Sequence, residues 1–132
     1  MIIKIPISAG ELIDKITILE IKTEFIDDSA KLSIINKELG LLKKEFDRVI
    51  REFPNLVKKI NSAMKDLQNV NRKLWNVENK LRSMESHREF ESEFIEAARK
   101  VYILNDKRGK IKNKINKVFG STISEIKSYT KY

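Results

Sequence analysis

Few residues in this chain of 132 could carry out catalytic chemistry. It has no cysteine and one histidine, His87, which excludes thiol catalysis, disulfides, zinc fingers and paired-histidine metal centres. Its four glycines are scattered, so it has no glycine-rich phosphate loop, and it lacks a Gly-x-Ser-x-Gly nucleophile motif. We expect His87 to be an ordinary exposed side chain. We therefore expect no metal, no cofactor and no enzymatic activity.

Arg108 is the charged residue whose position calls for a partner. It falls within the apolar pattern of residues 92–119, and burying a guanidinium without a carboxylate is strongly unfavourable. We expect it either to pair with a carboxylate, for which Glu20, Glu78 and Asp106 are candidates, or to lie at an end of the bundle. A polar cluster there would either fix helix register and partner choice, as in coiled coils, or bind a small anion around Arg108. The other residues that flank the same apolar stripes are Asn71, Trp75 and Asn105.

A row of lysines suggests a different activity, nucleic-acid binding. Lys107, Lys110, Lys114 and Lys117 recur three and four positions apart, Lys112 is nearby, and no acidic residue occurs from 107 to 124. On a helix this row would be about 15 Å long and could contact successive phosphates. Such a row is more often a solvated helix face, and no aromatic residues are interleaved with it. Nucleic-acid binding is therefore retained as an alternative.

Apolar residues spaced three and four positions apart predict four helices that would position these groups. Ser8 and Glu11 have the spacing of a capping box, and Gly120 suits the left-handed position after the last helix. We expect one all-α domain over 1–132, an antiparallel helical bundle with long coiled-coil hairpins. The predicted helices are 8–26, 30–53, 55–86 and 92–119, with a tail over 120–132 and a short extended segment over 2–7.

Pro54 leaves the path of the chain open, because the apolar pattern keeps its phase across it. Either the chain makes a hairpin turn there, or a single kinked helix continues through it. We favour the hairpin, since a single domain must bury both apolar seams. The stretches 55–86 and 92–119 have similar lengths and predict an antiparallel hairpin of their own. The extended segment and the tail could pair with each other or with a partner chain.

Two glycines, Gly40 and Gly109, lie inside predicted helices, where glycine is about 1 kcal/mol less favourable than alanine. They are either simply tolerated or mark the close approach of a neighbouring helix.

Surplus apolar residues predict self-association. Ile95, Ala98 and Tyr102 form a second stripe on the last helix, and Ile34 and Leu41 lie off the main stripe of the second. Ile50 lies off that stripe as well, and the first helix carries a second stripe of Ile18, Ile21 and Phe25. A four-helix domain of this size cannot bury all of them, so a two-fold homodimer is the simplest expectation. We therefore interpret the chain as a non-catalytic interaction or assembly protein whose protein partner is unknown.

Charge and hydropathy set the remaining expectations. The net charge is +8, yet residues 1–28 contain three basic and six acidic side chains. The acidic first helix should therefore pack against the basic later ones and leave a basic outer surface. No stretch is long and apolar enough to span a membrane, and no secretory signal is evident, so we expect a cytoplasmic protein.

The segment Ile7–Lys22, ISAGELIDKITILEIK, resembles the start of a family of small uncharacterised bacterial and phage proteins, known only as a domain of unknown function. Further matching segments extend the resemblance over almost the whole chain, except around Pro54. It implies a cytosolic bacterial or phage protein without an assigned activity. Ser8 and Glu11 match too, but capping already accounts for them. The site residues that the resemblance implies are Asp14, Lys15, Glu20, Asn71, Trp75, Glu78, Asn105, Asp106, Arg108, Lys127 and Tyr129.

Overall fold

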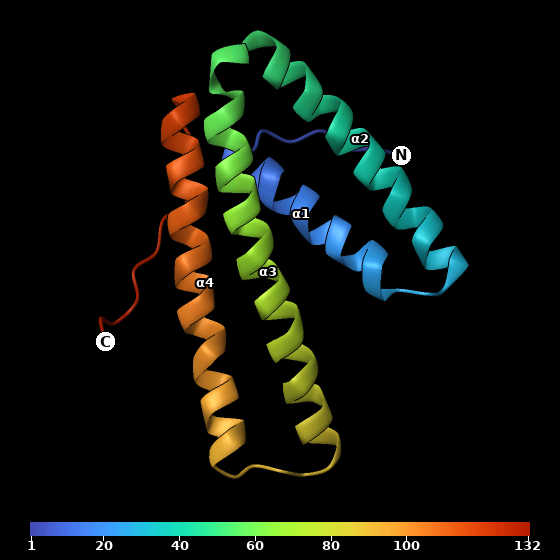
Figure 1. Ribbon diagram of the computed structural model, residues 1–132, viewed down its shortest axis with the longest axis vertical. Coiled ribbons are helices and arrows are strands. Elements are labelled where there is room, and N and C mark those ends of the chain that lie inside the picture. The colour runs from blue at the N-terminus through green and yellow to red at the C-terminus, as the bar shows by residue number, and fades with distance from the viewer.

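The computed structural model describes residues 1–132 and is all-helical, as predicted (Figure 1). A single turn of 3₁₀ helix, η1 (Pro54–Leu56), joins the second helix to the third. The helix bounds lie within two residues of the predicted ranges, and residues 1–7 form neither helix nor strand. The four helices are α1 (Ala9–Phe25), α2 (Ser29–Glu52), α3 (Val57–Ser86) and α4 (Ser92–Phe119).

Helices α3 and α4 form the predicted antiparallel hairpin, which is the longest part of the molecule (Figure 1). Leu67, Leu74 and Ala97 are among the apolar residues that it buries. Helix α1 crosses one half of the hairpin and also packs against α2, so it contacts all three other helices. It therefore lies at the centre of the fold, and the two buried apolar clusters meet along it.

The chain turns at Pro54, so one continuous kinked helix is excluded. Phe53 leaves the helical conformation (φ −129°, ψ 59°), and Pro54 occupies the first position of η1. Our expectation that α2 and α3 would pack along each other is wrong. The two helices meet only near the turn. Away from it, α2 runs at an angle to α3 and packs mainly on α1 (Figure 1). Only its last turns, with Phe46 and Ile50, reach the cluster around Ile60 on α3.

Side chains and a glycine mark the helix ends as predicted. The Ser8 hydroxyl accepts the Glu11 N–H at 3.1 Å, and Gly120 adopts the left-handed conformation (φ +63°) after α4. The second half of the predicted capping box is wrong, because the Glu11 carboxylate binds Lys112 instead of the Ser8 N–H. None of the helices is both long enough and apolar enough to cross a membrane.

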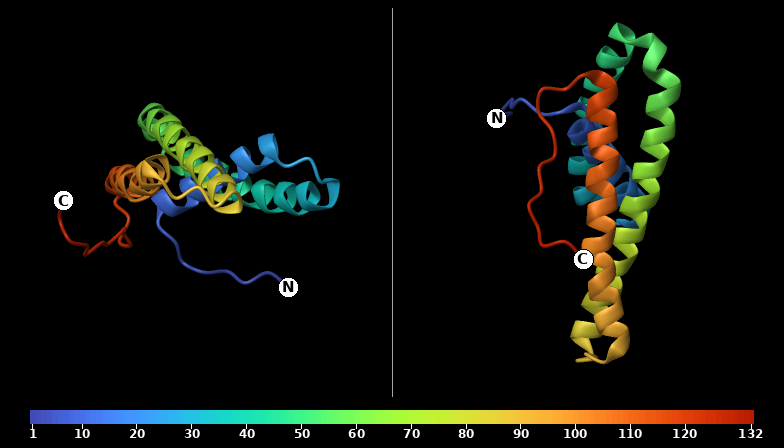
Figure 2. Two further views of the ribbon diagram at one scale, coloured as in Figure 1. Left: turned by 90° about the horizontal axis from the view of Figure 1, so that it is seen from below. Right: turned by 90° about the vertical axis from the view of Figure 1, so that its left-hand side faces the viewer.

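The two flanking segments do not pair with each other. Residues 1–6 are exposed and extend away from the helices, whereas the tail after Gly120 runs back along α4 (Figure 2). The Asn113 side chain fixes the tail by bonding both backbone groups of Glu125: it accepts from the N–H at 2.8 Å and donates to the C=O at 2.9 Å.

Candidate functional site

A buried carboxylate, Asp14 on α1, is the centre of the polar cluster. Its side chain is fully buried, and Arg108 Nε on α4 donates to its Oδ1 at 2.9 Å while Nη2 donates to its Oδ2. This hydrogen bonding raises the pKa of Arg108. Our prediction that Arg108 pairs with Glu20, Glu78 or Asp106 is therefore wrong. The side chain of Arg108 remains 28% exposed, so one edge of the guanidinium faces outward.

Two further side chains, those of Asn71 and Thr17, form hydrogen bonds around Asp14. Asn71 Nδ2 on α3 lies 2.9 Å from both Asp14 Oδ1 and Thr17 Oγ1, and the Thr17 hydroxyl donates to the Asp14 carbonyl at 2.8 Å. All three residues are buried. Hydrogen bonds that are satisfied in a buried site fix the positions of their donors and acceptors. The cluster therefore ties α1 to both α3 and α4.

Lys112 is buried in the same cluster, which contradicts its predicted place among lysines that could contact phosphates. Its Nζ lies 2.5 Å from a Glu11 oxygen, 3.0 Å from Glu125 and 3.9 Å from Asp14. Burial alone would lower the pKa of Lys112, but the hydrogen bonds that Lys112 donates to Glu11 and Glu125 outweigh it and raise that pKa. Lys112 therefore holds α1 and the tail to α4 and is not free to bind a polyanion.

Gly10 is a point of close approach between α1 and α4. A β-carbon at this position would lie 2.4 Å from the Lys112 carbonyl oxygen, and the Gly10 N–H donates to Asn116 Oδ1 at 2.7 Å. The close approaches that we considered at the two other glycines do not occur between helices. Gly40 faces open space, and the nearest neighbour of Gly109 is the Lys127 side chain of the tail, 3.1 Å from the β-carbon position.

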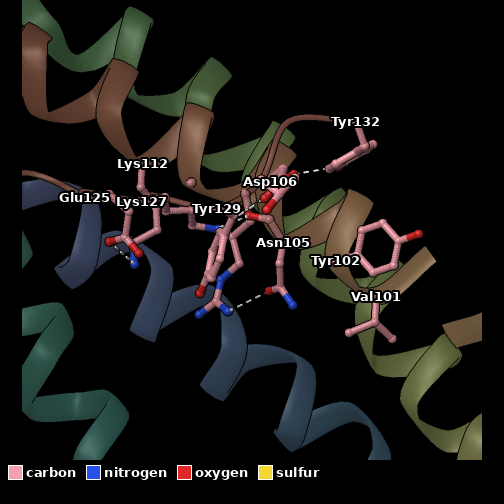
Figure 3. Close-up of a pocket in the computed structure, with 12 residues that line it drawn as sticks. Val101, Tyr102, Asn105, Asp106, Lys112, Glu125, Lys127, Tyr129 and Tyr132 are labelled. Carbon is pink, nitrogen blue, oxygen red and sulfur yellow. Dashed lines mark hydrogen bonds and ion pairs between the residues drawn. The ribbon is translucent and has the colours of Figure 1, made fainter. Parts of the chain in front are cut away.

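The tail and α4 enclose a cavity of about 670 Å³ beside the cluster (Figure 3). Lys112 and Glu125 lie at one end, and Tyr102 and Tyr132 at the other, where their rings meet edge to face at 5.4 Å. Arg108 lines this cavity and also a second one of about 340 Å³ between α1, α3 and α4. Arg108 thus separates two cavities.

In a comparison with known families, a model described as a family of unknown function (DUF6165) covers residues 3–132. The chain belongs to this family. No curated protein and no solved structure matches the chain significantly. Membership in DUF6165 confirms the expected resemblance to a family of unknown function that covers most of the chain, and the description of this family names no activity.

The structure of this DUF6165 member brings most of the predicted site residues together. Asp14, Asn71 and Arg108 form the buried cluster. Four more line the larger cavity: Asn105, Asp106, Lys127 and Tyr129. Trp75 and Glu78 line the smaller one with Asn71, Asn105 and Arg108.

Two predicted residues do not join the DUF6165 site. Lys15 is exposed and is not part of the cluster. Glu20 faces α2 and α3, where it pairs with Lys43 at 3.0 Å and accepts from Gln68 at 2.7 Å. The site also contains residues that were not predicted from the sequence to belong to it: Gly10, Glu11, Thr17, Lys112, Asn113, Asn116, Glu125 and Tyr132.

Apart from the buried Lys112, the lysines of the predicted row lie on the surface of α4. Lys107, Lys110, Lys114 and Lys117 are exposed along α4, and none of them lies within 4.0 Å of a carboxylate. They form a free positive surface on the side of α4 that α1 and α3 do not cover.

Apolar side chains remain exposed on three helices of this DUF6165 protein, including Phe25 (47% exposed) on α1. Ile34 (71% exposed) and Leu41 lie on α2, and Ile95 and Tyr102 lie on α4. The second stripe of α1 is mostly used within the chain, because Ile21 is buried and Phe25 stacks on Trp75 at 5.6 Å. The surplus of apolar surface is therefore smaller than predicted and is concentrated on α2 and α4.

Proposed function

We propose that the protein is a non-catalytic helical interaction module that self-associates through α2. The observation that supports this most strongly is the poor burial of α2, a helix of 24 residues in which only Leu39 is buried. Its other stripe residues, such as Leu32, Ile35 and Leu42, are half-buried. Helix α1 covers one side of α2, and only the last turns of α2 also contact η1 and α3.

The apolar positions of α2 suit two neighbours rather than one. At 3.6 residues per turn, the arc from Leu32 and Leu39 through Ile35 to Ile34 and Leu41 spans about half of the helix circumference. Along this arc the exposed fraction of the side chains rises from 9% at Leu39 to 48% at Leu41 and 71% at Ile34. Glu38 and Glu45 also lie within the arc, and Arg48 pairs with Glu45.

A second copy of the chain supplies a neighbour with the same apolar arc. A two-fold axis places the same patch of both copies in contact, so one self-complementary surface is sufficient. Pairing of the two α2 helices would bury Ile34 and Leu41 of both chains. We further propose that the protein acts in the cytoplasm of a bacterium or phage-infected cell.

Sedimentation velocity tests the proposal directly. The wild-type chain should sediment as a dimer, and Ile34→Glu/Leu41→Glu should weaken association by about a hundredfold, because each charge replaces a side chain that buries apolar surface. Both positions are exposed in the single chain, so the helical circular dichroism should not change.

The matched control is Ile95→Glu, which places the same charge on the exposed stripe of α4. This variant should remain dimeric. A wild-type chain that stays monomeric at its solubility limit would contradict self-association, and dissociation by Ile95→Glu alone would contradict the assignment to α2.

A second candidate function, nucleic-acid binding, is favoured by the four free lysines of α4. Four phosphate contacts would give a slope of about −3.6 in a plot of log affinity against log salt concentration for duplex DNA. Lys110→Glu/Lys114→Glu should reduce the affinity and flatten this slope in fluorescence anisotropy. The control Lys37→Glu/Lys44→Glu makes the same charge change on exposed positions of α2. Equal losses in both variants, or no binding at about 50 mM salt, would contradict the assignment.

A further inference from the structure

We infer that the cavity between α4 and the tail binds a small organic anion with a planar apolar body. Its volume of about 670 Å³ is within the range of small-molecule sites, about 300–1,000 Å³. The cavity combines an aromatic end with charged and polar side chains, which include Arg108, Lys112, Lys127, Asp106 and Glu125.

Arg108 supplies the charge that would recognise the anion. Nε and Nη2 both donate hydrogen bonds to the Asp14 carboxylate, so the plane of the guanidinium is fixed. The remaining nitrogen, Nη1, has only a contact of 3.5 Å with Asn105 Oδ1. Its N–H groups are therefore available to an oxygen atom of a ligand, and a charged hydrogen bond to a carboxylate or phosphate is the strongest that they could form.

Asn105 lies beside this free edge and contributes a second donor. Its carbonyl oxygen faces Arg108, and its amide NH₂ donates to no other protein group in the structure. Both residues line the cavity. The Arg108 Nη1 and Asn105 amide donors are therefore close enough to bind the same carboxylate or phosphate group of a ligand.

The far end of the cavity would hold the rest of the ligand. Tyr102 and Tyr132 form an edge-to-face pair there, with Val101 beside them (Figure 3). Tyr102 is 47% exposed, so its ring presents uncovered apolar surface. A planar ring that carries a carboxylate fits between this surface and Arg108, whereas a bare anion would leave the aromatic end unused.

Benzoate is the probe for this site, titrated into the ¹⁵N-labelled full-length protein. It should cause saturable shifts of the Asn105 side-chain NH₂ and the Gly109 amide resonances. The uncharged analogue benzamide should bind about tenfold or more weakly, because it lacks the charged hydrogen bond. Acetate should also bind about tenfold or more weakly, because it lacks the ring. Equal binding of benzoate, acetate and inorganic phosphate would indicate an adventitious ion only and would overturn the inference.

Variants locate the site. Asn105→Asp places a carboxylate beside Arg108 and should abolish benzoate binding, and Tyr102→Ala should weaken it while retaining the fold. Lys22→Gln is the control, because Lys22 lines only the smaller cavity on the other side of Arg108. An absence of saturable shifts, or binding that is lost in Lys22→Gln and kept in Asn105→Asp, would overturn the inference.

Discussion

Replacing Asp14 with alanine is expected to lower the free energy of unfolding by about 3–5 kcal/mol, because it removes one partner of a buried ion pair. The Arg108 guanidinium would lose its only carboxylate, and the Asn71 amide would lose one of its two acceptors. The other charged neighbour, Lys112, keeps Glu11 and Glu125. Urea unfolding followed by circular dichroism would measure the loss.

An exposed ion pair provides the matched control for this prediction. Glu24 on α1 pairs with Arg72 on α3, as Asp14 pairs with Arg108 on α4, but both of its side chains are well exposed. Glu24→Ala should therefore cost less than about 1 kcal/mol. The double variant Asp14→Leu/Arg108→Met should be closer to wild type than Asp14→Ala, because it leaves no unpaired buried charge. Equal losses in Asp14→Ala and Glu24→Ala would show that burial does not determine the effect.

Helix positions were predictable because they depend on local sequence. Apolar residues three and four apart give one face of a helix, and the ends follow from Ser8 and Gly120. Each of these signals lies within a few residues of the feature that it determines. The class of the fold and the antiparallel pairing of α3 with α4 follow from such signals and from the similar lengths of the two helices.

The partner of Arg108 was not predictable in the same way, because it lies 94 positions away on another helix. Asp14 follows the buried Ile13 on a helix that packs against three neighbours. A helix buried on several sides has no single polar face, so the periodicity of the sequence does not show which polar residue points inward. Helix α4 also packs against two helices, so the sequence pattern did not distinguish the buried Lys112 from the exposed lysines beside it.

The path of α2 also depends on tertiary packing. Pro54 interrupts the helix, but it does not specify whether the preceding helix returns along α3 or leaves at an angle. The outcome is decided by α1, whose Leu12, Ile16 and Leu19 pack against Leu39 and so hold α2 on the far side of α1 from the hairpin. The position of the tail was not predictable either, because the tail has no periodic pattern. It is fixed by hydrogen bonds between the Asn113 side chain and the backbone of Glu125, which do not depend on the side chain of Glu125.

Gly10 and Gly40 are expected to respond with opposite signs to the same substitution. Gly10→Ala should lower the free energy of unfolding by about 3 kcal/mol, near the upper end of the usual cost of overpacking. The new methyl group would lie 2.4 Å from the main-chain oxygen of Lys112, which cannot rotate away as the end of a side chain could. Relief of this clash would move α1 off α4 and strain the contacts of Asp14 and Glu11 with α4.

Gly40→Ala should instead raise the free energy of unfolding by about 0.5–1 kcal/mol, since alanine is the better helix former and less flexible when unfolded. Its methyl group would meet no atom within 4 Å. Urea unfolding of both variants at the same protein concentration gives the comparison. An increase in the free energy of unfolding at both glycines would mean that helix propensity dominates at each position. In that case the close approach of α1 to α4 at Gly10 would not limit the stability of the fold.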